Sequence, residues 1–341
     1  MTMKIGVGRR KSVSVSQNSL VTMRPLSEGN PLPLVIEPAA SGVNLIEWAA
    51  TNKAMLQDLV LTHGGLLFRN FNISTPGDME HFITAVSEAP LEYRERSSPR
   101  SKVSGNIYTS TDHPPEYPIF MHNENSYQDA WPLKIFFCCA IAAERGGETP
   151  IADCRRVTAR LDPAIRERFE RLGWMYVRNF GDGFGLPWQT VFQTEDKAAV
   201  EEYCRGKGID FEWKEQGRLR IRATRPAITR HPKTGEEIWF NHLTFFHIST
   251  LEEAVRNSLL AEFGEHDLPT NTFYGDGASI EPEVLDELRR LYNEETVSFP
   301  WQVGDLLMLD NMICGHARAP FEGKRQILTG MAEPIRRSDV G

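Results

Sequence analysis

Cysteine is scarce in this sequence and shows no motif spacing. The five cysteines are odd in number and include no CxxC pair, which favours a reducing compartment over a disulfide framework. We therefore expect a cytoplasmic protein whose cysteines are small buried hydrophobes.

Long apolar runs and an excess of positive charge are also absent. No stretch approaches the roughly 18 consecutive apolar residues that a membrane helix needs, so we expect a soluble protein that does not enter a membrane. The formal net charge of −8 argues against nucleic acid as a partner, because proteins that bind it usually gather a basic face to neutralise phosphates. Small molecules or other proteins are the expected partners.

No internal repeat, low-complexity linker or clean domain boundary interrupts the chain. The basic run near its start, residues 9–11, lies in a polar segment without the apolar stretch of a secretory signal. We interpret residues 1–20 as a mobile tail and residues 21–341 as a single domain, which is long enough to bury a sizeable core.

Helices are predicted from apolar spacing and end signals. Apolar residues recur at helical spacing from residue 45 to 63, and Gly64 follows as a C-cap would. Thr75 precedes a second helix that begins at Pro76. Further helical segments are predicted around residues 162–163 and over residues 195–205.

Short strands are predicted through the middle and end of the chain, in segments bounded by Gly, Pro and Asn. They are residues 66–71, 174–180, 218–224, 236–241, 305–310 and 325–332, with a turn at 231–236. This mixture lacks the regular alternation of strand and helix in a doubly wound parallel sheet. It predicts a mainly β fold with α insertions, in which a double-stranded β-helix (jelly roll) core is flanked by helices.

Two residues with metal-binding side chains, His122 and Glu124, stand just before the apolar run KIFFCCAIA. With 9 His and 46 acidic residues in the chain, about one such pair is expected by chance, so the pair alone is weak evidence. In a strand, side chains at i and i+2 share a face, which would direct both toward one metal ion. A third ligand is available in His316, which follows an apolar strand ending in Asp310-Asn311.

The chemistry of such a triad is specific. Two imidazoles and one carboxylate on one face of an octahedron leave three positions open, an arrangement associated with non-heme Fe(II) oxygenases. O2 and a chelating co-substrate can share these positions. If the co-substrate is 2-oxoglutarate, its far carboxylate needs a bidentate donor, which guanidinium provides better than ammonium. The candidates are Arg325, on the next predicted strand, and Arg318, two residues after His316.

Four motifs occur in the order found in a known family. They are HNENSYQ at 122–128, GGET at 146–149, LDNMICGH at 309–316 and RAPFEGKR at 318–325. With these motifs the chain resembles, from about residue 66 to 331, the taurine dioxygenase (TauD/TfdA-like) family of Fe(II)/2-oxoglutarate oxygenases. The resemblance implies a dioxygenase that acts as a hydroxylase, with Fe(II) as cofactor and with 2-oxoglutarate and O2 as co-substrates.

Carried onto this sequence, the resemblance assigns iron to His122, Glu124 and His316. It assigns the far carboxylate of 2-oxoglutarate to Arg325, and a hydrogen bond to the co-substrate to Thr149. The interval from His316 to Arg325 is shorter than in several relatives, so Arg318 stays open as an alternative. Many relatives carry aspartate at the position of Glu124. The longer side chain is similar to that of the clavaminate synthase and arginine hydroxylase branch, which acts on amino acids.

Residues 95–114 and 239–247 are similar to the syringomycin-pathway aspartate hydroxylase (SyrP-like) and its kin in peptide natural-product clusters. This likeness implies an amino-acid substrate, either free or bound to a carrier protein. Candidate substrate contacts lie in these segments or beside the first motif, and they are Arg96, Asn125, Trp239 and Asn241. The remaining histidines of the second half are interpreted as structural or solvent-exposed, namely His231, His242, His247 and His266.

The resemblance leaves alternatives open. Related enzymes also desaturate or cyclise their substrates, and the sequence does not separate these reactions from hydroxylation. Halogenation is disfavoured, because the halogenases of this superfamily replace the carboxylate ligand and Glu124 is present. A non-catalytic jelly-roll binding protein would keep the fold without turnover, and a zinc hydrolase would use the same three ligands without O2. A homo-oligomer is also compatible with the sequence.

Overall fold

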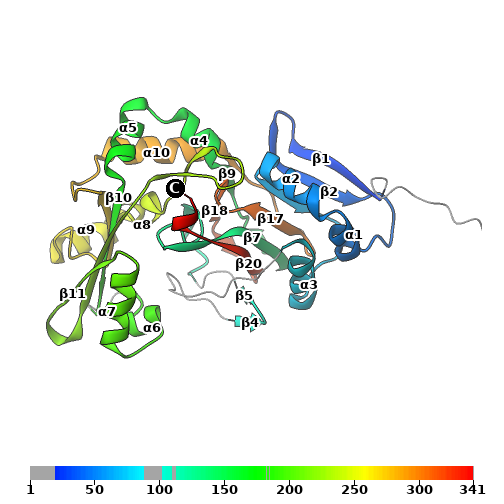
Figure 1. Cartoon of the computed structure of the whole chain (residues 1–341). Coiled ribbons are helices and arrows are strands. Elements are labelled where there is room, and N and C mark those ends of the chain that lie inside the picture. The colour runs from blue at the N-terminus through cyan, green and yellow to red at the C-terminus, as the bar shows by residue number, and fades with distance from the viewer. Residues whose placement is uncertain (1–19, 88–101, 110–112, 182, 184, 341) are drawn as a thin grey trace, which may run out of the picture.

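A computed structural model describes residues 20–87, 102–109, 113–181, 183 and 185–340. Its largest sheet has eight strands in the order β1-β2-β3-β17-β7-β20-β5-β4 (Figure 1). These strands are β1 (Val21–Ser27), β2 (Asn30–Pro38), β3 (Gly65–Phe68), β4 (Lys102–Ser104), β5 (Ile107–Thr109), β7 (Ala130–Ile141), β17 (Leu306–Asp310) and β20 (Gln326–Arg336). Only β2 and β3 pair in parallel within this sheet, so it is otherwise antiparallel.

The two faces of this sheet pack against different layers. On β17, Leu306 and Met308 pack with the helices α1 (Leu45–Thr51), α2 (Lys53–His63) and α3 (Pro76–Val86). The alternate residues Leu307 and Leu309 point to the opposite face and belong to a separate buried cluster. β7 is buried in the same way on both faces, which explains why its sequence is a continuous apolar run rather than an alternating one.

A second, four-stranded sheet lies on that opposite face. It has the order β16-β9-β18-β6, with β16 (Thr296–Val297), β9 (Ile151–Asp153), β18 (Cys314–Arg318) and β6 (Ile119–His122). Its Ile151 and Cys314 share one buried cluster with Leu307 and Ile327 of the large sheet. The two sheets therefore face each other across one apolar layer. A short pairing of β8 (Arg145–Gly146) with β19 (Phe321–Glu322) lies beside them.

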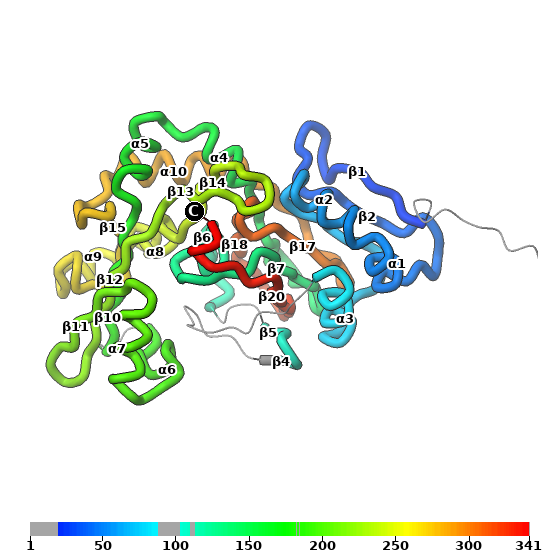
Figure 2. The backbone as a smooth tube through the Cα atoms, in the orientation of Figure 1, coloured from blue at the N-terminus to red at the C-terminus, as the bar shows by residue number. Residues whose placement is uncertain are grey.

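A third group of elements, between residues 154 and 295, lies on the other side of the central strands from β1, β2 and α1 (Figures 1 and 2). It contains the sheet β11-β12-β10-β15, made of β11 (Asp210–Trp213), β12 (Leu219–Arg225), β10 (Trp174–Phe180) and β15 (Thr270–Tyr274). A hairpin of β13 (Ile228–Arg230) and β14 (Glu237–Trp239) accompanies this sheet.

The helices of this group are α4 (Cys154–Arg160), α5 (Pro163–Leu172), α6 (Trp188–Phe192), α7 (Lys197–Gly206), α8 (Leu243–Phe246), α9 (Glu253–Glu262) and α10 (Pro282–Glu295). Short 3-10 turns occur at Glu215–Gly217, Ile248–Thr250 and Arg337–Asp339. The element α8 contacts β6, β10 and β15, so this short helix joins the third group to the second sheet.

The prediction of a mainly β fold with helical insertions is confirmed, and every predicted strand overlaps an observed one. The single helix predicted over residues 45–63 is wrong in one respect, because it breaks at Asn52 into α1 and α2. The Asn52 side chain donates to the carbonyl of Trp48 and ends the first helix there. Gly64 caps α2 with a φ of 77°, and Thr75 caps α3 through a capping box, both as predicted.

Two absences expected from the sequence can be compared with the described residues. All five cysteines are described, and each is buried and free of a disulfide bond. Within the described ranges, no helix has the length and apolar character needed to cross a membrane. The predicted mobile tail at residues 1–20 falls, except for Leu20, outside the described residues.

Candidate metal centre

His122 and His316 come from neighbouring strands of the second sheet. β6 and β18 pair antiparallel, and the register places His316 directly opposite His122. Directly opposed residues of an antiparallel pair have adjacent side chains on one face. The two imidazole ring centroids are accordingly 4.4 Å apart, although 194 residues separate the two histidines in the chain.

Glu124 reaches the same point by a different route from the one predicted. β6 ends at His122 and Glu124 lies in the following turn, so the expected i, i+2 geometry of a strand is wrong. The side-chain amide of Asn311 holds this turn, because its Oδ1 accepts from the Glu124 N–H at 2.7 Å and its Nδ2 donates to the Glu124 carbonyl at 2.9 Å. Asn123 returns a hydrogen bond of 2.8 Å to the Asn311 carbonyl. Asn311, which directly follows β17, therefore positions Glu124, the candidate metal ligand.

The three side chains form a buried cluster suited to a divalent cation. Each offers a ligand atom, and these atoms lie within 4.8 Å of one another. Nε2 of His316 is 3.7 Å from Oε2 of Glu124. Nδ1 of His122 lies 2.8 Å from the Phe120 carbonyl and donates to it in the tautomer that leaves Nε2 as a ligand. Burial, together with the nearby His316 and His242, lowers the pKa of His122 well below 6.5, so the ring is neutral as a metal ligand must be.

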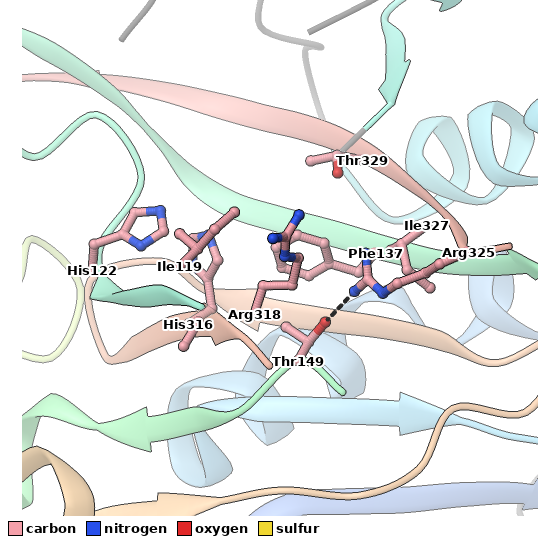
Figure 3. A pocket seen from close by; sticks show the side chains of 10 residues that line it. Ile119, His122, Phe137, Thr149, His316, Arg318, Arg325, Ile327 and Thr329 are labelled. Carbon is pink, nitrogen blue, oxygen red and sulfur yellow. Dashed lines mark hydrogen bonds between the residues drawn. The ribbon is translucent and has the colours of Figure 1, made fainter. Parts of the chain in front are cut away.

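A pocket opens beside the cluster, between the two facing sheets (Figure 3). Its wall is formed by Ile119, His122, Phe137, Thr149, His316, Ala317, Arg318, Arg325, Ile327 and Thr329. β7 and β20 supply one side, and β6 and β18 supply the other. The imidazoles of His122 and His316 and the guanidinium groups of Arg318 and Arg325 thus line a single pocket.

Arg325 lies immediately before β20 rather than within the predicted strand. Its Nε donates to the Gly147 carbonyl at 2.8 Å, and its Nη2 lies 3.5 Å from Oγ1 of Thr149. The indole N–H of Trp301 also donates to this hydroxyl, at 3.1 Å. Thr149 therefore helps to fix the Arg325 side chain in the pocket (Figure 3).

Arg318 is held differently. Its guanidinium donates to three backbone carbonyls, those of His113, Pro114 and Tyr117. Burial and the charge of Arg318 together lower the pKa of Arg325 to about 10, at which it still carries its proton at neutral pH. Two cationic groups in one largely apolar pocket create a site for an anion.

The predicted substrate contacts fall in different places. Asn125 follows Glu124 in the turn with a φ of 56°, and its buried Oδ1 has no hydrogen-bond partner among the described residues. Trp239 is fully buried in the core against Phe169, and the side chain of Asn241 caps the start of α8 by accepting from the Leu243 N–H. Neither of the last two lines the pocket. The candidate Arg96 lies outside the described residues.

His242, interpreted from the sequence as structural or solvent-exposed, lies buried beside the candidate metal centre. His242 is buried with its ring centroid 5.0 Å from that of His122, and Ser126 lies 2.8 Å from its Nδ1. Burial lowers the pKa of His242 to about 3, so its ring is neutral. No motif spacing marks this residue, because its position depends on α8 folding against β6.

The remaining histidines of the second half have structural contacts. His231 Nδ1 accepts from the backbone N–H groups of Lys233 and Thr234 and so closes the predicted turn at 231–236. His247 Nδ1 accepts from the backbone N–H of Ser249, and the His266 ring stacks on Phe273. These three agree with the interpretation made from the sequence.

Comparison with known proteins decides the family. Residues 24–332 match the family described as "Taurine catabolism dioxygenase TauD, TfdA family". The chain belongs to this family. It is therefore a dioxygenase that uses Fe(II), 2-oxoglutarate and O2, and its substrate is a small molecule.

Two individual proteins are similar to this TauD/TfdA-family chain over most of its length. It is 39% identical over 313 residues to the dapdiamide synthesis protein DdaC of Enterobacter agglomerans, covering 92% of this chain and 94% of that protein. It is 29% identical over 324 residues to a clavaminate synthase-like protein of Arabidopsis thaliana, covering 90% and 95%.

Solved structures share the fold at low sequence identity. PvcB, described as an Fe, alpha-ketoglutarate dependent oxygenase from an isonitrile synthetic pathway, matches with a TM-score of 0.56 at 15% identity over all of both chains. A taurine dioxygenase from Burkholderia xenovorans matches with a TM-score of 0.55 at 15% identity, covering 94% of this chain and 92% of that one.

Proposed function

We propose that this dioxygenase hydroxylates an amino acid, free or bound to a carrier protein, in natural-product biosynthesis. The buried His122, Glu124 and His316 beside a cationic pocket carry the proposal of a metal-dependent oxygenase. The relation to a dapdiamide synthesis protein, over 92% of the chain, supports a role in making a natural product. Glutamate rather than aspartate in the triad supports an amino acid as substrate.

Each site residue has a proposed task. His122, Glu124 and His316 hold the iron, which together with 2-oxoglutarate activates O2 for attack on a C–H bond. Arg325 receives the far carboxylate of 2-oxoglutarate through paired N–H groups, because guanidinium matches carboxylate geometry. Thr149 orients Arg325 and offers its hydroxyl to the co-substrate.

The Asn125 side chain is the best supported of the four candidate substrate contacts. Its Oδ1 is a buried acceptor with no partner among the residues described, next to the metal ligand Glu124. A buried polar atom costs stability until it is paired. A substrate N–H, such as an amino-acid ammonium group, would satisfy it.

We propose further that the two facing sheets form a double-stranded β-helix, with residues 21–341 as one domain. The buried cluster shared by β7, β9, β17 and β18 supports the first point, and the family match over residues 24–332 supports the second. A cytoplasmic location agrees with five buried cysteines that form no disulfide. The oligomeric state, monomer or homo-oligomer, does not enter the proposed chemistry.

An anaerobic titration tests the proposed function. Fe(II) and then 2-oxoglutarate are added to metal-free protein, and the visible charge-transfer band of a chelated 2-oxo acid is recorded. We expect the band in the wild-type protein and in His81→Ala, which removes an exposed histidine of α3, but not in His122→Ala. No band in well-folded wild-type protein would contradict the proposal and favour a binding protein or a zinc hydrolase. Screening amino acids for products would then separate hydroxylation from desaturation or cyclisation.

A further inference from the structure

Two arginines are buried on the same face of the sheet β11-β12-β10-β15. Arg178 lies on β10 and Arg225 on β12, and only 7% and 6% of their surfaces are exposed. In the antiparallel register Arg225 is opposite Trp174, and Arg178 is four residues after Trp174 on the same strand. Opposed residues share a face and so do residues at even spacing, so both guanidinium groups lie on one side of the sheet.

Their hydrogen bonding differs completely. Arg225 donates to four backbone carbonyls, those of Tyr127, Lys207, Gly208 and Thr224. Among the residues described here, the Arg178 guanidinium makes no hydrogen bond or ion pair, and its Nη1 is fully buried. Its guanidinium carbon lies 4.9 Å from the centre of the Phe180 ring. A buried N–H group without an acceptor costs stability, so a ligand group that accepts a hydrogen bond from Nη1 would be favoured here.

The face that carries Arg178 is directed toward the metal centre. Tyr176 shares this face two residues earlier on β10, and its ring lies 6.0 Å from Tyr127 and 6.3 Å from Phe246. Both of those rings contact His242, at 5.0 and 4.7 Å, and His242 in turn contacts His122 at 5.0 Å.

The position of α8 agrees with this chain of contacts. α8 packs against both β6 and β10, and Figure 1 shows it between β10 and the central strands. Arg178 is not part of the pocket that contains Arg325, so the two cations serve different sites.

We propose that Arg178 binds a carboxylate group of the substrate and thereby selects an acidic substrate for this enzyme. This inference rests on the proposed function, and it specifies the chemical group by which the substrate is held near the metal centre. A planar guanidinium pairs with carboxylate through two parallel hydrogen bonds, which would also orient the substrate. The carboxylate has two sources, the α-carboxylate of a free amino acid or the side-chain carboxylate of an acid whose α-carboxylate is bound to a carrier.

A stability measurement separates this role from a structural one. Arg178→Met removes the charge and keeps an unbranched side chain, so we expect the melting temperature of the metal-free protein to rise by about 2 °C or more. Arg225→Met is the matched control, and its melting temperature should fall because four carbonyls lose their donor. An equal fall for Arg178→Met would show that Arg178 holds the fold and would overturn the proposal.

A binding measurement identifies the carboxylate. Protein loaded with Co(II) and N-oxalylglycine is titrated with the protein amino acids and with their α-carboxamides, and the visible Co(II) spectrum reports binding beside the metal. We expect one acid to bind at least about tenfold more tightly than its neutral counterpart in the wild type, with no such preference in Arg178→Met. Arg178→Lys should recover part of the preference.

The pattern of lost affinity separates the two sources. If the α-carboxamide binds more weakly than the amino acid, the α-carboxylate is the group that Arg178 binds. If asparagine binds more weakly than aspartate, or glutamine more weakly than glutamate, the group is a side-chain carboxylate. An unchanged preference in Arg178→Met, or no binding of any amino acid to the loaded wild type, overturns the inference. Failure of N-oxalylglycine itself to bind would instead contradict the proposed function.

Discussion

At the scale of single residues, the two arginines of the pocket differ in their hydrogen-bond partners. Nη1 and Nη2 of Arg318 donate to three backbone carbonyls between residues 113 and 117, so this side chain supports that segment. The guanidinium of Arg325 donates to the Gly147 carbonyl and lies 3.5 Å from the Thr149 hydroxyl in the wall of the pocket. We propose this side chain as the receptor for the far carboxylate of the co-substrate.

We therefore expect Arg325→Gln to raise the 2-oxoglutarate concentration for half-maximal turnover at least about tenfold, because a charge-assisted bidentate pair is lost. Iron affinity should change little, since no metal ligand is altered. Steady-state turnover and a separate metal titration measure the two quantities. Arg318→Gln is the control, and it should lower stability by about 1–3 kcal/mol with little effect on the 2-oxoglutarate requirement. The reverse result would assign the co-substrate to Arg318.

The sequence alone points to those residues that lie in short, contiguous motifs. The candidate metal ligands and the pocket arginines stand in recognisable motifs, so they could be proposed from the sequence before their positions were known. The placement of Glu124 could not, because the turn depends on the Asn311 amide, which is 187 residues away. Arg178 belongs to no motif, and it was identified only because its buried Nη1 has no hydrogen-bond partner among the described residues.

At the scale of elements, the GGET segment shows how a short connection shapes the pocket. Gly146 ends β8 and Gly147 follows it, with φ values of 67° and 74°, which residues with side chains rarely adopt. A Cβ on Gly147 would stand 3.0 Å from Cδ and 3.1 Å from Nε of Arg325. The second glycine of the motif thus leaves room for Arg325, the proposed receptor of the co-substrate carboxylate.

Gly147→Ala should consequently weaken 2-oxoglutarate binding by displacing Arg325, with an expected three- to tenfold rise in the concentration needed, on the order of 1 kcal/mol. Gly235→Ala is a matched control, because Gly235 also has a positive φ of 73° but has no atom near its Cβ position. Both variants should lose similar stability in urea unfolding, whereas only the first should alter the co-substrate requirement. Equal kinetic effects in both would show that backbone strain, and not contact with Arg325, is the cause.

Elements with a strong signal in their sequence were predictable, and elements without an apolar or end signal were not. The caps at Gly64 and Thr75 and the turn at 231–236 follow from side-chain chemistry within a few residues. β1 was not predicted, because most of its residues are exposed and its identity as a strand comes from pairing with β2. The break at Asn52 was also missed, since the apolar spacing continues across it.

At the scale of the whole molecule, the metal centre is a point where distant parts of the chain meet. One ligand comes from β6, one from the following turn, and the third from β18, near the end of the chain. The co-substrate pocket adds β7 and β20 from the large sheet. A ligand bound there contacts both facing sheets, which the unfolded chain cannot bring together.

Metal and co-substrate analogue should therefore stabilise the whole fold by mass action. A ligand that binds only the folded chain, at 100 times its dissociation constant, contributes about 2.7 kcal/mol. For a chain of 341 residues this corresponds to a rise in melting temperature of about 4 °C. Calorimetry of the metal-free protein with Co(II), and then with N-oxalylglycine added, measures each contribution.

The order in which Co(II) and N-oxalylglycine are added tests whether both bind at one site. N-oxalylglycine should add stability only after Co(II), because the metal supplies half of its binding site and Arg325 the other half. Glu124→Ala should abolish both increments while melting near the metal-free wild type, since the side chain is a ligand rather than part of an apolar cluster. If the variant gained the full increment, the cation would be bound elsewhere and the triad would lose its role.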